Sequence, residues 1–565
     1  MLINRWLIYP SDIGVTGGIK SCMVGDLVYE FITTIAKKQC TVQIRLSHHL
    51  ARHFSISNDL RLRGSDTVSS FLKKLSESSQ FSLLKVLDLE TCKCFGGKNK
   101  HYLKDICCKI LLLKYLSLKR TDVTHLPKEI NNLHELEVLD IRHTKVSVYA
   151  TRNVSLLKLK RLLVGYTDPS PSNTYTGTTF KIEEYPRSVQ VPDKIEKMLD
   201  MEVLSNVTAP SSQALKDIGE LCQLRKLGVV IEEKVTHLQN LLVAISNMHE
   251  CLQSLSITII PITRHKCTFS RIRTPSTANN DYGLSYPPKV VKSLSIIGTT
   301  QKVQLLQKLL ENDGCSKLVK VTLCGTCLNQ DDLNVLAKLS ELLCMRLGDK
   351  AYTESKLIFK NNEFNKLKFF HVEGSNMAEI SFGDGAVPEL EKIVLSSAND
   401  LKSVFGVEGL SKLKELELNN NKLLTLFDKA NQIAKVTLLG TFLRQGDLQI
   451  LARKPNMHCL VLLENSYIEG HLSFNKEEFP KLNLLTIDNS HIANISFNCG
   501  STPKLKKIIW SLTKDIVVTL SGINNLSRLK EFELNGESIP NEVQEAIKRH
   551  RNKPILKHNK PKNQE

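Results

Sequence analysis

A short hydrophobic motif, Leu-x-x-Leu-x-Leu, recurs along this 565-residue chain and constrains its fold more than any other feature. It occurs at 84–89, begins again 29 residues later at 113–118, and again after a further 23 residues at 136–141, where Ile141 takes the last position. A segment of this length cannot bury its leucines alone, so neighbouring segments must stack and share one core. The chain is also longer than the roughly 300 residues at which a single core stops growing.

The spacing predicts a curved leucine-rich-repeat solenoid of the α/β class, with a parallel sheet on its concave face. We expect this domain at residues 46–547, each motif supplying a strand whose side chains alternate between core and concavity. Further strands are expected at 52–57, 201–207, 224–230, 252–257, 291–296, 319–323, 342–347, 367–372, 390–395, 413–418, 434–438, 457–462, 482–487, 505–510 and 529–534.

A long block of the sequence is duplicated. The segment 321–326, VTLCGT, returns 115 residues later at 436–441 as VTLLGT. The same offset carries 388–393, PELEKI, onto 503–508, PKLKKI. The copies therefore span about 321–395 and 436–510, and whole blocks can be copied because each layer contacts only its neighbours.

Two segments lack the motif. Residues 167–195 and 261–289 are rich in Pro, Ser, Thr and Asn, which is typical of long surface loops. Because loops often carry function, these segments are an alternative location for a partner-binding site.

The charge balance raises the question of an anionic partner. Lys and Arg number 76 against 58 Asp and Glu, a net charge of +18, with a basic flexible tail expected at 548–565. The sequence contains no nucleic-acid-binding motif, so we expect no nucleic-acid partner.

Cysteine usage and targeting signals suggest a compartment. Fifteen cysteines without framework spacing favour a reducing environment, and Cys324-x-x-Cys327 lacks the second pair that a zinc site needs. We find neither a signal peptide nor a long apolar span, so we expect a cytoplasmic protein without bound metal.

The first 45 residues do not follow the repeat. Residues 4–14 followed by 19–28 resemble the C-terminal part of the winged-helix domain in plant nucleotide-binding leucine-rich-repeat (NLR) immune receptors. There a strand ending in a Met-His-Asp triplet precedes a helix; here Val24, Gly25 and Asp26 occupy the triplet and 27–38 would form the helix. Residues 126–136 and 539–547 resemble, respectively, early repeats and the closing segment of coiled-coil-class receptors from grasses.

The sequence departs from this family at the nucleotide site. The triplet His is thought to sense the nucleotide phosphate, but Gly25 has no side chain, and the chain contains no G-x-x-x-x-G-K-[ST] loop. The chain thus resembles only the sensor half of a receptor, and no cofactor is expected. The resemblance implies protein partners in defence: a pathogen effector, a guarded host protein or a paired NLR.

Catalytic signatures are also missing. His249-Glu250 lacks the second His of H-E-x-x-H, and no G-x-S-x-G elbow occurs, so we do not expect an enzyme. The alternative function is a substrate adaptor of a ubiquitin ligase, which would need an F-box helix pair before the repeats. Residues 1–45 do not read as such a pair.

Candidate partner-binding residues lie at the variable positions of the C-terminal strands. Each flanks an inward Leu or Ile, so the period of two along a strand points it away from the core. The candidates are Glu417, Asn419, Thr486, Asp488, Glu533 and Asn535. The duplicated block supports this region, because its copies keep their inward residues but differ at outward ones, such as His371 against Thr486 and Glu373 against Asp488.

Nucleotide binding provides a first test. We expect isothermal titration calorimetry of the chain with ADP or ATP and Mg²⁺ to show no binding, because the phosphate loop is missing and Gly25 replaces the His. Stoichiometric heat release would contradict this expectation.

Overall fold

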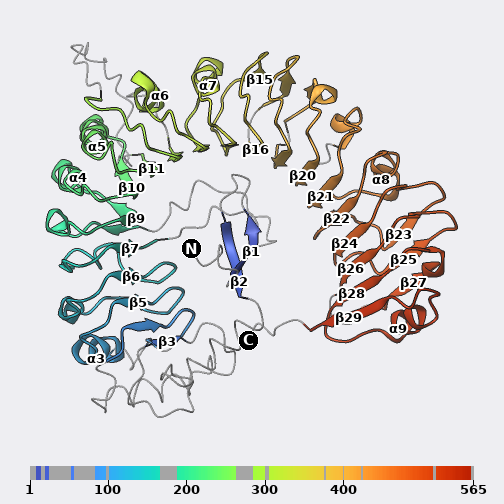
Figure 1. The fold of residues 1–565 in the computed structure, drawn as a ribbon, viewed down its shortest axis with the longest axis horizontal. Coiled ribbons are helices and arrows are strands. Elements are labelled where there is room, and N and C mark those ends of the chain that lie inside the picture. The colour runs from blue at the N-terminus through green and yellow to red at the C-terminus, as the bar shows by residue number, and fades with distance from the viewer. Residues whose placement is uncertain are drawn as a thin grey trace, which may run out of the picture. The chain divides into compact units, whose positions relative to one another are not determined.

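The computed structural model describes strands at 8–13, 19–24 and 53–55 and residues 83–560, apart from 94, 97–100, 166–187, 262–283, 299–304, 375–376, 399, 421–423 and 513–516. The described chain divides into two compact units between Val321 and Thr322, within strand β13 (Lys320–Cys324). Each unit is a leucine-rich-repeat solenoid: its strands form a parallel sheet on one face, and short helices or second sheets form the other (Figure 1).

The strands of the first unit's main sheet pair in parallel, in chain order. They are β3 (His53–Ser55), β4 (Val86–Asp88), β5 (Tyr115–Ser117), β6 (Val138–Asp140), β7 (Arg161–Leu163), β9 (Val203–Thr208), β10 (Lys226–Glu232), β11 (Ser254–Ile260) and β12 (Ser293–Ile297). The return segments contain α3 (His101–Lys109), η5 (Lys128–Asn132), η6 (Ile195–Lys197), α4 (Ser212–Gly219), α5 (Val235–Asn247), α6 (Leu305–Leu310) and η7 (Glu311–Asp313).

The second unit's main sheet is also parallel. It contains β14 (Cys344–Leu347), β16 (Phe369–Glu373), β18 (Lys392–Ser396), β20 (Glu415–Asn419), β21 (Lys435–Leu439), β22 (Cys459–Leu462), β24 (Leu484–Asp488), β26 (Lys507–Ser511), β28 (Glu531–Asn535) and β29 (Ile555–Asn559). The opposite face carries α7 (Gln330–Ala337), η8 (Val407–Gly409), η9 (Leu424–Phe427), α8 (Gln445–Ala452), η10 (Ile523–Asn525) and α9 (Asn541–Lys548).

Two small sheets on that opposite face were not predicted. One contains β15 (Lys356–Phe359), β17 (Glu379–Phe382) and β19 (Ser403–Phe405); the other contains β23 (His471–Phe474), β25 (Asn494–Phe497) and β27 (Thr519–Ser521). Stacked rings fill the space behind each: Phe359 on Phe382 and Phe474 on Phe497, both with centroids 5.0 Å apart. The duplication therefore extends to the second sheets.

The inward leucines meet in register across the layers. In the first unit, Leu87, Leu116, Leu139 and Leu162 lie opposite one another on β4–β7, and none has exposed surface. Each leucine therefore completes the core of the layer on either side, as expected for stacked repeats.

The predicted strands begin about two residues early. Strand β24, predicted from Leu482, begins at Leu484, because the Leu482 amide donates to the Phe479 carbonyl in the preceding turn. Leu482 is nevertheless fully buried. The first Leu of the motif is thus a core residue of the corner before the strand.

The ends of the chain differ in part from expectation. Residues 548–565 were predicted to be a flexible tail, but Ile555–Asn559 form β29, which pairs with β28 throughout. In the N-terminal segment, β1 (Ile8–Ile13) and β2 (Ile19–Val24) form an antiparallel pair that ends at Val24. Gly25, Asp26 and the expected helix 27–38 lie outside the described residues, so the winged-helix assignment stays a prediction.

Placing a charged side chain in the core of one layer tests whether the layers stack as described. Leu139→Asp should destabilise its layers by roughly 4 kcal/mol or more, because it deletes a buried side chain and buries an unpaired carboxylate. Hydrogen exchange should rise across β5–β7. Val138→Asp, one residue away on the outward face and partly exposed, is the control and should leave exchange unchanged. Equal effects at both positions would contradict the layer register.

Candidate functional site

The outward face of the second unit's main sheet carries one continuous row of side chains. The row is fixed by strand register, because each residue lies directly opposite the next across its pair of strands. It contains Arg346, His371, Val394, Glu417, Thr437, Val461, Thr486, Ile509, Glu533 and Lys557. Three of the six candidate residues, Glu417, Thr486 and Glu533, belong to it, and the other three lie two positions further along the same strands.

The two copies of the duplicated block differ in how far their apolar outward residues are covered. In the first copy, Cys344, Phe369 and Val394 form one buried cluster, and the Arg346 guanidinium lies 5.2 Å from the centre of the Phe369 ring. The equivalent residues of the second copy, 115 positions later, are Cys459, Leu484 and Ile509, and all three are partly exposed.

The partly exposed residues form an apolar strip across β21–β26. Val461 lies between Thr437 and Thr486 in the row, and Leu439 and Leu463 add apolar surface at the strand ends. Outward positions of a half-buried strand are normally polar, so this run is unusual. Sequence reasoning missed the strip, although apolar residues at outward positions of adjacent strands were a readable signal. We call Leu439, Cys459, Val461, Leu463, Leu484 and Ile509 the apolar strip.

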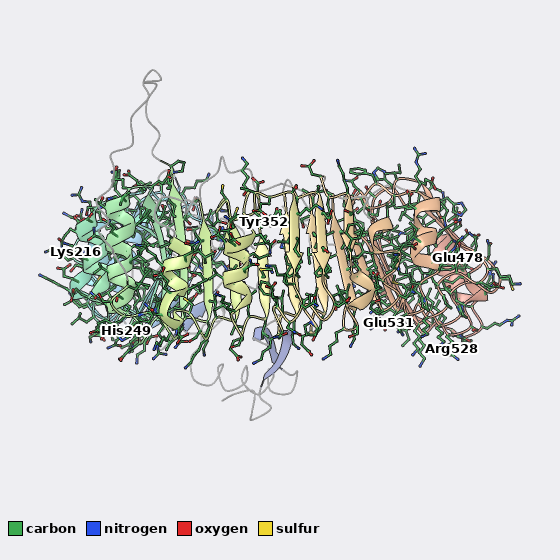
Figure 2. The ribbon with its side chains drawn as sticks, turned by 90° about the horizontal axis from the view of Figure 1, so that it is seen from above. Lys216, His249, Tyr352, Glu478, Arg528 and Glu531 are labelled. Atoms are coloured by element: carbon green, nitrogen blue, oxygen red, sulfur yellow. The ribbon has the colours of Figure 1, made fainter. Side chains whose placement is uncertain are left out.

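Ion pairs lie on both sides of the apolar strip. On one side Lys392 is 2.7 Å from Glu417, and Lys435 is 3.4 Å from Glu415. On the other side Lys507 lies 2.6 Å from Glu531 and 2.7 Å from Glu533. Lys557 lies 3.1 Å from the same Glu531, which is labelled in Figure 2. These partly exposed pairs leave each flank close to neutral, so each contributes little stability on its own.

The two candidate asparagines, Asn419 and Asn535, form hydrogen bonds with neighbouring side chains on the sheet face. Asn419 donates to the Ser396 hydroxyl and to the Glu417 carboxylate, both at 3.1 Å, and only 8% of its surface is exposed. Asn535 makes the matching 3.1 Å bond to Ser511 in the second copy and is more exposed. Asn419 is therefore a covered residue rather than the solvated one expected from strand alternation.

Burial shifts the protonation of two side chains on this face. His371 is 5% exposed, and burial together with nearby Arg346 lowers its pKa to about 4, so it is neutral at physiological pH. Burial also raises the pKa of the Asp488 carboxyl, against a hydrogen bond from Ser511. For Glu417, burial favours a higher pKa, but Lys392 and Asn419 together outweigh it and the pKa is lowered.

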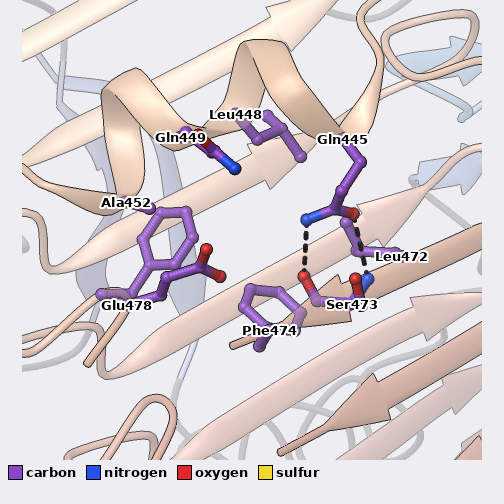
Figure 3. Close-up of a pocket in the computed structure, with 9 residues that line it drawn as sticks. Gln445, Leu448, Gln449, Ala452, Leu472, Ser473, Phe474 and Glu478 are labelled. Atoms are coloured by element: carbon purple, nitrogen blue, oxygen red, sulfur yellow. Dashed lines mark hydrogen bonds between the residues drawn. The ribbon is translucent and has the colours of Figure 1, made fainter. Parts of the chain in front are cut away.

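The residues packed around α8, behind the sheet, leave no room for a ligand. Gln445 on α8 donates to the Ser473 carbonyl at 2.7 Å and accepts from the Ser473 amide at 3.1 Å (Figure 3). Gln330 makes the same pair of bonds with Ile358 in the first copy. The space around Gln445, Leu448 and Phe474 is too small for a water molecule, so these contacts are structural.

Cys324 and Cys327 are free thiols whose sulfur atoms lie near backbone carbonyls, and the described residues contain no group of three potential metal ligands. Within the same part of the chain, no helix has the length and apolar character to cross a bilayer. The expected loops at 167–195 and 261–289 lie largely outside the described residues; of the remainder, β8 (Val189–Gln190) pairs with β9.

The two carboxylates with opposite pKa shifts give a matched pH test. Glu417 ionises more easily when folded, so it stabilises the fold above its ordinary pKa of about 4.5, and this contribution is lost as pH falls through the lower folded value. Asp488 ionises less easily when folded, so its charge costs stability above its raised pKa. At pH 7, Glu417→Gln should lower the free energy of unfolding by about 1 kcal/mol, and Asp488→Asn should slightly raise it. Urea titrations at pH 7 and pH 4 measure both; shifts of the same sign would contradict the assignment.

The repeat architecture agrees with a known family model. Residues 61–437 match the model described as leucine-rich repeat region. Among solved structures, the crystal structure of an internalin from Listeria monocytogenes is similar with a TM-score of 0.37 and 16% identity, covering 70% of this chain and 94% of that one.

Curated relatives cover most of the chain. Disease resistance protein Pik-2 of Oryza sativa subsp. japonica is 24% identical over 516 residues, which is 81% of this chain and 47% of that protein. Disease resistance protein RGA4 of the same subspecies is 31% identical over 180 residues, 29% of this chain and 18% of its own length. The chain spans about half the length of the Pik-type relatives that it matches. It belongs to the leucine-rich repeat region family, and its curated relatives are plant disease-resistance proteins.

Proposed function

We propose that this chain is a non-enzymatic protein-binding domain of plant defence that takes a pathogen effector or a guarded host protein on the outward sheet face of its second unit. The observation that carries the proposal is the apolar strip, in which Cys459, Leu484 and Ile509 stay partly exposed where their equivalents in the first copy, Cys344, Phe369 and Val394, are buried.

The chemistry of this face resembles that of protein interfaces. Interface centres are depleted of charge, and polar residues surround them. The apolar strip contains no charged residue, and the Lys392 and Lys507 ion-pair groups border it on either side. A partner that covers the strip would remove apolar surface from water at about 25 cal/mol per Å² without breaking these pairs.

The site lies on regular strands rather than on loops. Every residue of the strip is held by the backbone pairing of β21, β22, β24 and β26 or directly follows it. Little conformational entropy is lost when such a rigid surface binds, which favours affinity. The names of the curated relatives support a role in disease resistance, and the identity of the partner is part of the proposal.

Paired substitutions on the two faces of the unit test the proposal. The chain would be screened against a panel of secreted pathogen effectors and plant host proteins, and affinities of the partners found would be measured by biolayer interferometry. Val461→Lys with Ile509→Lys should weaken binding at least about tenfold, because both charges enter the centre of the contact. Ile358→Lys with Ile468→Lys, exposed apolar residues outside the main sheet, is the control and should leave affinity unchanged.

A different pattern would locate the site elsewhere. If the folded strip variant binds as tightly as the unmodified chain, the sheet face is not the site. Loss of binding on replacing 262–283 by a Gly-Ser linker would then assign it to the second of the expected loops.

A further inference from the structure

One rim of the second unit is formed by the residues that lie just before each strand of its main sheet. In and directly after the first copy of the duplicated block, the charges along this rim form ion pairs. Lys412 lies 2.5 Å from Glu389, and Lys368 lies 2.8 Å from Glu391. Each pair joins residues of neighbouring layers, so cations and carboxylates alternate along this rim. Lys366 and Glu341 continue the pattern at 2.7 Å.

The second copy replaces the carboxylates by cations. Lys504 and Lys506 occupy the positions of Glu389 and Glu391, 115 residues later. Arg528 and Lys530 follow at the positions of Lys412 and Lys414, after one inserted residue. All four side chains are exposed, and no carboxylate of a described residue lies within ion-pair distance of them. We call Lys504, Lys506, Arg528 and Lys530 the basic rim.

Part of the basic rim lines a surface hollow. Three of its cations, together with Ser527, Leu529 and Asn552, line an open space of about 640 Å³. The Asn552 amide donates to the Ser527 carbonyl at 2.6 Å and so fixes the wall of the hollow. Arg528 lies at the edge of the ribbon in Figure 2. Four cations that form no ion pair with a described carboxylate repel one another, and an anionic ligand would reduce that repulsion.

We propose that the basic rim binds an acidic, extended segment of a protein. The four cations lie just before the neighbouring strands β26 and β28, and same-side carboxylates of an extended chain, about 6.5–7 Å apart, can reach more than one of these flexible side chains at once. Arg528 can hold a carboxylate through two parallel hydrogen bonds. This site is distinct from the apolar strip, so it goes beyond the function proposed above.

The lining favours a peptide over other polyanions. Single-stranded nucleic acid is held by aromatic rings on which bases stack, and the residues that line the hollow include none. Peripheral membrane sites insert apolar side chains into the bilayer, whereas the only apolar residue of the lining, Leu529, is fully buried.

A charge exchange between the copies tests this site. The probe is a fluorescein-labelled peptide of alternating Asp and Gly, measured by fluorescence anisotropy with the full chain. Lys504→Glu with Lys506→Glu gives the second copy the carboxylates of the first, so position 504 can pair with Arg528 and the thermal unfolding midpoint should not fall. Peptide affinity should drop at least about tenfold and lose its dependence on salt.

The control makes the same change in net charge elsewhere on the unit. Lys402→Glu with Lys429→Glu replaces two exposed lysines away from the basic rim and should weaken peptide binding less than about twofold. Equal loss in both variants would show that only net charge matters and would overturn the site. The proposed site would also be overturned if the unmodified chain did not bind the peptide. Tighter binding of the chain to a single-stranded oligonucleotide or to phosphatidylserine vesicles would overturn it as well. Binding at the apolar strip is unaffected by these variants, so the two proposals fail separately.

Discussion

The burial of one layer's aliphatic side chains against the next is the interaction on which the rest of this structure depends. Leu116 and Leu139 have no core of their own; each is covered only because the adjacent strand repeats the same residue in register. That register is held by main-chain hydrogen bonds, so it places outward side chains as strictly as inward ones. The row from Arg346 to Lys557 is therefore a consequence of core packing, and its side chains are free to vary.

The duplicated block shows how that freedom has been used. Phe359 with Phe382 and Phe474 with Phe497 keep the same stacking, so the interiors of the two copies are equivalent. Their surfaces are not equivalent on either the sheet face or the rim. Val394 is covered where Ile509 is partly exposed, and Glu389 binds a lysine where Lys504 has no described carboxylate beside it. One scaffold thus presents two chemically different surfaces within one unit.

Much of the main sheet could be predicted because its signal is local: leucines at fixed spacing identify a strand and its inward face. The second sheets were missed because strands such as Glu379–Phe382 lack the Leu-x-x-Leu-x-Leu spacing, although the repeated Ile-Ser-Phe at 380–382 and 495–497 marked them. The outward direction of Glu417 and Glu533 followed from strand alternation. The burial of Asn419 and the ion pairs of Lys392 and Lys507 depend on neighbouring layers more than twenty residues away, which no single motif encodes.

The constant offset between the copies has a consequence for how such a gene can change. Residues 397–511 contain one full set of layers, because they begin after β18 and end with its counterpart β26. Removing these residues joins β18 to the chain that normally follows β26. The next strand, β28, would then pair with β18, which is the counterpart of its usual partner β26. Unequal recombination between the copies would therefore add or delete a complete module and keep the strand register at the junction, where Leu395 would replace Trp510 opposite Leu534. The length of the solenoid can evolve in whole modules, while point substitutions alter its surfaces independently.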